Sequence, residues 1–295
     1  MYTVTREVSA HDDGVWGVAW TPTTNQVLTS AVDAAVKCWD GATGELVRTL
    51  DGAHQLGIHS LSADATGQRA LTAALDHRMV LWDLTNGEVV REITTEPNGN
   101  AAARLAPAGD VLAAGGPTGN VTFWSAATGE KVQTVQASPK YTTALAYSPD
   151  GKTLACGTQA GHVDLIDVES GKLLHSLSGH ASTVRSLAFS PDATQLYSTS
   201  DDRRVHLYDA QYGNLIAALV GHSSWVLGVT CHADGDQLGT ASSDRTVKLW
   251  SSRMRQCVDT LNHHTDDVWG VAFSPKGDEL VSSGEDGMLM WYKAL

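Results

Sequence analysis

The sequence predicts an all-β fold: a closed propeller of seven four-stranded blades that occupies residues 1–295 as a single domain. One hydrophobic strand of each unit ends at a nearly constant spacing of 42 or 43 residues, at Trp39, Trp82, Trp124, Ile166, Tyr208, Trp250 and Tyr292. Several units also carry Gly-His near the start and Trp-Asp near the end. A period of about 40–45 residues with these two marks is typical of WD-repeat blades.

Each unit repeats the same order of strand and turn signals. A His is followed by an alternating apolar strand such as Val15–Trp20, and a turn rich in Pro, Asp and Gly leads to a second strand. The third strand carries the aromatic, as in Val247–Trp250, and a Gly-containing turn precedes a fourth strand such as Leu46–Leu50. Alternation with period two between such turns predicts antiparallel strands, and we find no stretch with helical periodicity.

The two ends of the chain predict how the ring closes. The last unit stops soon after its third strand, at Tyr292–Leu295, and residues 3–8 precede His11 as Leu46–Leu50 precede His54. We therefore expect the N-terminal strand to complete the last blade, which removes the exposed edge that an open array would leave.

Composition limits the possible functions. The chain is 42% hydrophobic with a formal net charge of −13, and no dense Lys/Arg run occurs. Such a chain would repel a phosphate backbone, so we expect no direct binding of nucleic acid. The four cysteines are scattered and no stretch of about 18 apolar residues exists, so we expect a soluble protein of a reducing compartment, with no membrane contact.

Five units share polar residues at fixed spacing. A His precedes an Asp by 22 residues, the Asp precedes the strand aromatic by six, and a Thr or Ser stands ten residues before that aromatic. The five sets are His11, Thr29, Asp33 and Trp39; His54, Thr72, Asp76 and Trp82; His180, Ser198, Asp202 and Tyr208; His222, Thr240, Asp244 and Trp250; and His264, Ser282, Asp286 and Tyr292.

These residue types are those of a catalytic triad, but a structural interpretation explains them better. One active site does not need five copies around a ring, and a nucleophile must be exposed. In a buried chain, Asp fixes the His tautomer, His holds the hydroxyl, and the hydroxyl reaches the indole N–H or the phenol of Tyr208 and Tyr292. We expect no catalytic residue.

A zinc site is the other interpretation of repeated His and Asp. The His residues lie one per blade and cannot converge on a tetrahedral ion, and the adjacent pair His263 and His264 would bind a metal weakly. We expect no metal and no cofactor. Blades three and four lack the pattern, with Ala114 and Cys156 at the hydroxyl position, so we expect them to rely on apolar packing and to be the weakest sector.

One face of such a propeller is formed by the loops before the first strands and the turns between the second and third strands. Counting from each His places ten candidate partner-binding residues there: Trp16, His59, Tyr141, Arg185, Asp201, Trp225, Leu227, Asp267, Trp269 and Glu285. We expect Trp16, Trp225 and Trp269 to lie side by side next to acidic neighbours. Large apolar anchors beside carboxylates are typical of a hot spot for a peptide with an apolar residue and an Arg. One or more of the tryptophans could instead only plug the channel or pack between blades.

Several stretches resemble the WD-repeat subunit of the superkiller (Ski) complex, and the likeness extends over essentially the full length. They are His11–Trp16, Gly171–Leu177, Gly179–Leu187, Gly221–Leu227 and Asp266–Val271. Generic propellers share the Gly-His and Trp-Asp marks but do not usually carry Trp at these loop positions. Blade three departs from the family, because residues 99–103 are rich in Ala where the family has larger side chains.

The resemblance implies a non-catalytic adaptor found in the cytoplasm and the nucleus. Family members join an RNA helicase to a tetratricopeptide scaffold protein that feeds mRNA to the exosome for 3′-to-5′ decay. In animals the same subunit belongs to the RNA polymerase II-associated factor complex, which acts in transcription elongation, and in fungi it assists meiotic recombination.

Two alternatives stay open. The chain could be a receptor for a histone tail or another peptide in a chromatin or ubiquitin-ligase complex, because an acidic channel mouth suits a basic tail. It could also be an enzyme, although the ionisable groups at the channel (His59, Asp201 and Glu285) are spread around the ring.

Overall fold

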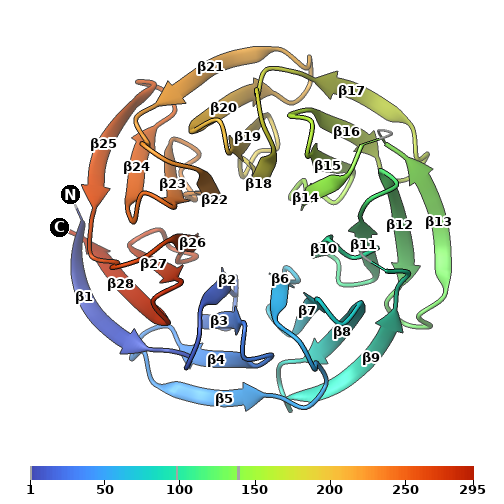
Figure 1. Ribbon diagram of the computed structural model, residues 1–295, viewed down its shortest axis with the longest axis horizontal. Helices are drawn as coiled ribbons and strands as arrows, with labels where there is room; N and C mark the ends of the chain where they lie inside the picture. The colour runs from blue at the N-terminus through green and yellow to red at the C-terminus, as the bar shows by residue number, and fades with distance from the viewer. Residues whose placement is uncertain (1, 98, 138–139) are drawn as a thin grey trace.

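Seven four-stranded antiparallel sheets form a ring around a central channel in a computed structural model that describes residues 2–97, 99–137 and 140–295 (Figure 1). The predicted all-β, seven-bladed propeller is confirmed, and no helix occurs among these residues. The innermost strands are β2 (Val15–Trp20), β6 (Ile58–Ala63), β10 (Ala102–Leu105), β14 (Thr142–Tyr147), β18 (Val184–Phe189), β22 (Val226–Cys231) and β26 (Val268–Phe273).

The other strands follow outward in chain order. The second strands are β3 (Gln26–Ala31), β7 (Arg69–Ala74), β11 (Val111–Gly115), β15 (Thr153–Thr158), β19 (Gln195–Ser200), β23 (Gln237–Ser242) and β27 (Glu279–Gly284). The third strands are β4 (Val36–Asp40), β8 (Arg78–Asp83), β12 (Asn120–Ser125), β16 (Val163–Asp167), β20 (Arg204–Asp209), β24 (Val247–Ser251) and β28 (Met288–Ala294). The outermost strands are β5 (Leu46–Leu50), β9 (Glu88–Thr94), β13 (Lys131–Gln136), β17 (Leu173–Leu177), β21 (Leu215–Val220), β25 (Gln256–Leu261) and β1 (Tyr2–Ser9).

The N-terminal strand closes the ring, as predicted. β1 pairs antiparallel with β28 from Tyr2 opposite Ala294 to Ser9 opposite Met288, and the two termini lie together in Figure 1. The backbone N–H of Tyr2 also donates to the carboxylate of Asp259 in blade six, at 2.9 Å. The seam is therefore held both within the last blade and to the blade before it.

Apolar side chains pack at every blade interface. Each of the seven clusters of buried residues combines two neighbouring blades, and one of them joins the last blade to the first. Trp250 and Trp291 are among the largest fully buried side chains. Full burial of a large apolar side chain contributes roughly 1.5–3 kcal/mol, so stability comes mainly from contacts between blades.

Side chains of the outermost strands add hydrogen bonds between blades that the sequence reasoning missed. Arg48 donates to the carbonyl groups of Leu84 and Thr85, which lie one blade further on. Arg6, Arg91, Gln133 and His175 reach the corresponding turn of the next blade. These residues recur at the repeat spacing, so aligning the fourth strands would have revealed them.

A bulge in six of the seven innermost strands directs one side chain per blade towards the channel. The pairing of first and second strands shifts register between Val15 and Gly17, and at the equivalent point of every blade except the third. The residues inside these bulges are Trp16, His59, Thr143, Arg185, Leu227 and Trp269, and all six line the channel cavity. In blade three the pairing of β10 with β11 shows no shift.

Candidate interaction face and its supporting hydrogen bonds

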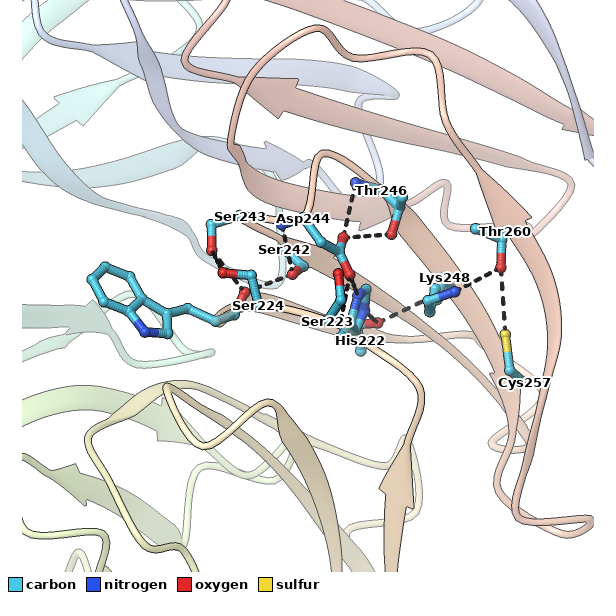
Figure 2. A network of polar contacts seen from close by, with 12 residues as sticks. His222, Ser223, Ser224, Ser242, Ser243, Asp244, Thr246, Lys248, Cys257 and Thr260 are labelled. Carbon is cyan, nitrogen blue, oxygen red and sulfur yellow. Dashed lines mark hydrogen bonds and ion pairs between the residues drawn. The ribbon is translucent and has the colours of Figure 1, made fainter.

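Each of the five patterned blades contains a hydrogen-bonded chain from carboxylate to imidazole to hydroxyl. The His Nδ1 atoms lie 2.8–3.3 Å from the Asp oxygens, and the Nε2 atoms lie 2.7–2.8 Å from the Thr or Ser oxygens. In blades one, two and six the indole N–H donates to the same hydroxyl, at 2.8–3.0 Å. Figure 2 shows the blade-six carboxylate of Asp244 against His222.

Electrostatics keep these chains in one protonation state. Burial would raise the pKa of Asp244, but hydrogen bonds from His222, Thr246 and Ser223 hold that pKa well below its usual range. Burial lowers the pKa of His11, His54 and His180, so these imidazoles are neutral at pH 7. A neutral imidazole facing a carboxylate through Nδ1 carries its proton there, so Nε2 accepts from the hydroxyl.

The same geometry does not suit catalysis. The hydroxyl residues Thr29, Thr72, Ser198, Thr240 and Ser282 are fully buried, so no substrate can reach them. A triad needs an accessible nucleophile. The chains instead tie the loop before the first strand to the turn between the second and third strands of the same blade.

The two tyrosine blades differ from each other. Ser282 Oγ lies 3.3 Å from the phenol oxygen of Tyr292, which matches the expected continuation of the chain. The phenol of Tyr208 hydrogen-bonds Nδ1 of His206 at 3.0 Å, a partner that the spacing did not predict. The His206 ring stacks on that of His180 with centroids 3.8 Å apart and planes 9° apart.

His180, Asp202 and His206 bring three possible metal ligands within 4.8 Å of one another. Nδ1 and Nε2 of His180 already bond Asp202 and Ser198, so a metal would have to displace one of them. The lone pairs of stacked imidazoles run parallel rather than towards one point, whereas zinc ligands must converge. The group therefore fits a buried polar cluster better than a metal centre.

Blades three and four do pack through apolar clusters, as expected, but polar links to neighbouring blades add to this packing. The side-chain amide of Asn100 in blade three donates to the carbonyl groups of Ala74 and Arg78 in blade two, at 3.0 and 3.1 Å. In blade four Thr143 donates to the carbonyl of Val184 in blade five at 2.6 Å. Polar links between blades replace the missing links within these blades.

The expected face exists because two sets of loops are joined by backbone hydrogen bonds. The N–H of Val32, Leu75, Gln159, Asp201, Ser243 and Glu285 donates to the loop before the first strand of the same blade, at 2.8–3.0 Å. We call this surface the upper face. It surrounds the mouth of the channel, where a cavity of about 250 Å³ lies.

Trp16 and Trp269 lie together on the upper face, at the seam between blades one and seven. Their rings are 6.2 Å apart at an angle of 58°. Both indole N–H groups donate to one oxygen of Glu285, at 3.0 Å from Trp16 and 2.7 Å from Trp269. One oxygen of the Glu285 carboxylate is thus engaged within the ring, while its predicted role towards a partner stays a prediction.

Trp225 does not join this pair, which corrects the expectation of three tryptophans side by side. The guanidinium carbon of Arg185 lies 5.7 Å from the centre of the Trp225 ring, and Arg185 forms a two-point ion pair with Asp201 at 2.7 and 2.8 Å. Trp225 is 51% exposed, and its indole N–H bonds none of the residues that the structure describes. Asp201 is therefore also occupied, whereas Trp225 is the accessible anchor.

The remaining candidates occupy different environments. Leu227 lines the channel but is buried, and Tyr141 lines a second hollow of about 240 Å³ together with His59 and Arg185. Burial, Asp266 and Glu285 raise the pKa of Asp267, which marks an excess of negative charge near the seam. On the opposite side of the mouth Asp201 balances the charge of Arg185, so the excess negative charge of the upper face lies at the seam.

The comparisons with known proteins agree with this architecture. The fold and face define the chain as a WD-repeat β-propeller, a class whose members are typically non-catalytic interaction scaffolds, and the model for the WD domain, G-beta repeat, matches residues 2–40, 44–83 and 255–293. The model described as Nucleolar protein 10-like, N-terminal domain, matches residues 64–246, well over half of the chain. The chain belongs to this β-propeller family.

One curated relative is similar over a short stretch. The Denticleless protein homolog of Danio rerio is 40% identical over 50 residues, which make up 17% of this chain and 8% of that protein. Because the match spans so little of the relative, it supports the repeat and nothing about partners. None of the described elements is a helix long and apolar enough to cross a bilayer.

Proposed function

We propose that the chain is a scaffold subunit of a Ski complex, which supports exosome-mediated 3′-to-5′ decay of mRNA in the cytoplasm. Its partners are a tetratricopeptide scaffold protein and an RNA helicase. We extend the proposal to a nuclear role with the RNA polymerase II-associated factor complex. The support is the resemblance of the loop sequences around Trp16, Trp225 and Trp269, together with the loop hydrogen bonds that hold these positions.

The observation that carries the proposal is the state of Trp225. A half-exposed indole normally lowers solubility. Here the Trp225 ring packs against Arg185, which is held by its ion pair with Asp201. A rigid aromatic side chain whose N–H bonds no residue of the described part of the chain is the kind of anchor that dominates protein interfaces. The acidic residues near Trp269 would orient a partner segment that carries a complementary positive charge.

Co-purification tests this function. The tagged chain, the Trp225→Ala variant and a Tyr212→Ala control would be compared by mass spectrometry. Tyr212 is 66% exposed but lies in the turn between β20 and β21, on the opposite face. The proposal expects a helicase and a tetratricopeptide protein with the parent and the control, and neither with Trp225→Ala.

A second candidate function is a receptor for a basic peptide such as a histone tail. The exposed carboxylates Asp12, Asp13 and Asp266 lie at the seam beside Trp16 and Trp269, with no described ion pair. Such a surface attracts Lys and Arg, and its affinity falls with salt. Chromatin or ubiquitin-ligase subunits with the parent, and no helicase, would favour this candidate over the first.

A further inference from the structure

Arg104 stands where the other blades have small side chains. The pairing register of the first and second strands places Arg104 opposite Ala113 in blade three. The equivalent residues of the other blades are Ala19, Ser62, Ala146, Ala188, Thr230 and Ala272. The first-strand residues before it, Ala102 and Ala103, are also small. Blade three therefore contributes one long cationic side chain to the channel wall, next to first-strand residues that are otherwise small.

The Arg104 guanidinium lines the channel cavity and has few partners. Its Nη1 donates to Ser60 Oγ at 2.8 Å and to the carbonyl of Ala103 at 2.9 Å. It forms no ion pair with a carboxylate in the described part of the chain, although the sequence has 33 Asp and Glu residues. A guanidinium offers five N–H donors, so most of its donors are left without a described acceptor.

The Arg104 side chain is half-buried, and none of its nitrogens is among the fully enclosed polar atoms without a partner, so its remaining donors face the solvent of the channel. Burial lowers the pKa of Arg104 to about 10, with no carboxylate acting in the other direction. A partly desolvated cation is normally paired with a counter-charge, which Arg104 lacks among the described residues. Arg185, the other arginine at this cavity, has such a counter-charge in Asp201.

The rest of the lining suits an anion. His59 is neutral at pH 7, because burial, His54 and Arg104 lower its pKa to about 4. No described carboxylate lines the cavity, and Ser186 lines the same space as Arg104. With a volume of about 250 Å³ the cavity has room for a small anion and water.

We propose that the channel cavity is an oxyanion-binding site in which the Arg104 guanidinium is the principal ligand. The ligand is a phosphate or carboxylate group, because planar N–H donors match the oxygens of both. It comes either from a free anion or from an acidic side chain of a partner segment that enters through the mouth. The proposal goes beyond the scaffold function and does not depend on the identity of the partners.

Thermal melting tests the site at constant pH 7 and constant ionic strength, with chloride replaced stepwise by inorganic phosphate. At tenfold excess over the dissociation constant, the Tm of the parent should rise by about 2–4 °C and then approach saturation. Arg104→Met should show no response, whereas Arg204→Met, which removes an exposed arginine from blade five, should respond like the parent. Equal responses of the parent and Arg104→Met would overturn the proposal.

A second arm uses the capped peptide Ac-Ala-Glu-Ala-NH2 in place of phosphate. A response to phosphate alone indicates a free anion, and a response to the peptide alone indicates a partner carboxylate. Absence of both responses in the parent overturns the proposal. In chloride, Arg104→Met should melt no lower than the parent, because it removes an unpaired charge. If Arg104→Met does not fold, equilibrium dialysis of labelled phosphate replaces thermal melting, and the parent is compared with Arg104→Lys. The proposal then requires detectable phosphate binding by the parent.

Discussion

The indole N–H of Trp16 donates to Oε2 of Glu285 at 3.0 Å, although the two residues are 269 positions apart in the chain. Trp269 donates to the same oxygen at 2.7 Å. One carboxylate thus joins the first and last blades on the upper face, directly beside the seam that β1 closes. Part of the predicted hot spot is therefore also a structural element of the ring.

Glu285→Ala should lower the free energy of unfolding by about 1–2 kcal/mol, because two indole N–H groups lose a charged acceptor. The groups are partly exposed, so water replaces some of the loss. Urea unfolding of the parent, Glu285→Ala and the exposed-site control Glu169→Ala would measure the difference. A Glu285→Ala curve that coincides with the control would show that the bridge does not stabilise the seam.

Removal of residues 2–8 should destabilise the whole ring rather than only the last blade. The deletion removes the pairing of β1 with β28 and leaves β28 as an open edge. The melting temperature should fall and association should increase, as seen by scanning calorimetry and light scattering. Deletion of Leu295, which is exposed, is the control, and an unchanged melting temperature in the 2–8 deletion contradicts the account.

Asp244→Ala should cost about 1–3 kcal/mol at pH 7, because His222 Nδ1 and two backbone N–H groups lose their acceptor. The folded pKa of Asp244 lies below its unfolded value near 4. Its contribution is therefore complete above that unfolded value and is lost as the pH falls towards the folded pKa. Urea unfolding at pH 7 and pH 3 checks this. The difference in stability between Asp244→Ala and the parent should shrink at pH 3, and the exposed control Glu169→Ala should not differ from the parent at either pH.

His206 should make the protein sensitive to mild acid. Burial, with His180 beside it, lowers the pKa of His206 to about 4, whereas the unfolded value is near 6.5. The unfolded chain therefore binds more protons than the folded protein between pH 6.5 and 4. The free energy of unfolding decreases as the pH is lowered through this window. The Nε2 atom of His206 is buried and has no hydrogen-bond partner among the described residues, so a proton there would be unfavourable.

His206→Val copies Val80, the equivalent residue of blade two, and should flatten part of this pH dependence. Urea midpoints at pH 7, 6 and 5 would be compared with those of His263→Gln, a variant at an exposed His. The parent and His263→Gln should lose stability in parallel, and His206→Val should lose less. A parallel loss in all three proteins would place the acid sensitivity elsewhere.

The fold could be predicted because the same order of strands and turns recurs in every blade. The spacing of His222, Thr240, Asp244 and Trp250 is set by strand length and turn length, so sequence distance converts directly into a hydrogen-bonded chain. The closing strand could be predicted for the same reason, because a missing fourth strand and a surplus first strand must pair to remove an edge.

The site was less predictable because its contacts cross between blades. Counting from each His placed Trp16 and Trp269 on the upper face, but not the shared bond to Glu285. Arg185 sits in a strand bulge that turns it towards Trp225, which separates that tryptophan from the other two. Arg104 was missed because blade three has no His from which to count, although aligning the strands shows one arginine among six small residues.

The most direct measurement is the affinity of the purified tetratricopeptide scaffold protein for this chain, by calorimetric titration of the parent, Trp225→Ala and Tyr212→Ala at one salt concentration. We expect tight binding by the parent and Tyr212→Ala, and a loss of affinity of at least about 30-fold in Trp225→Ala, as for an anchor that contributes about 2 kcal/mol or more. Circular dichroism would establish that all three proteins are folded. Equal affinity of the parent and a folded Trp225→Ala variant would contradict the claim that the upper face binds partners through Trp225.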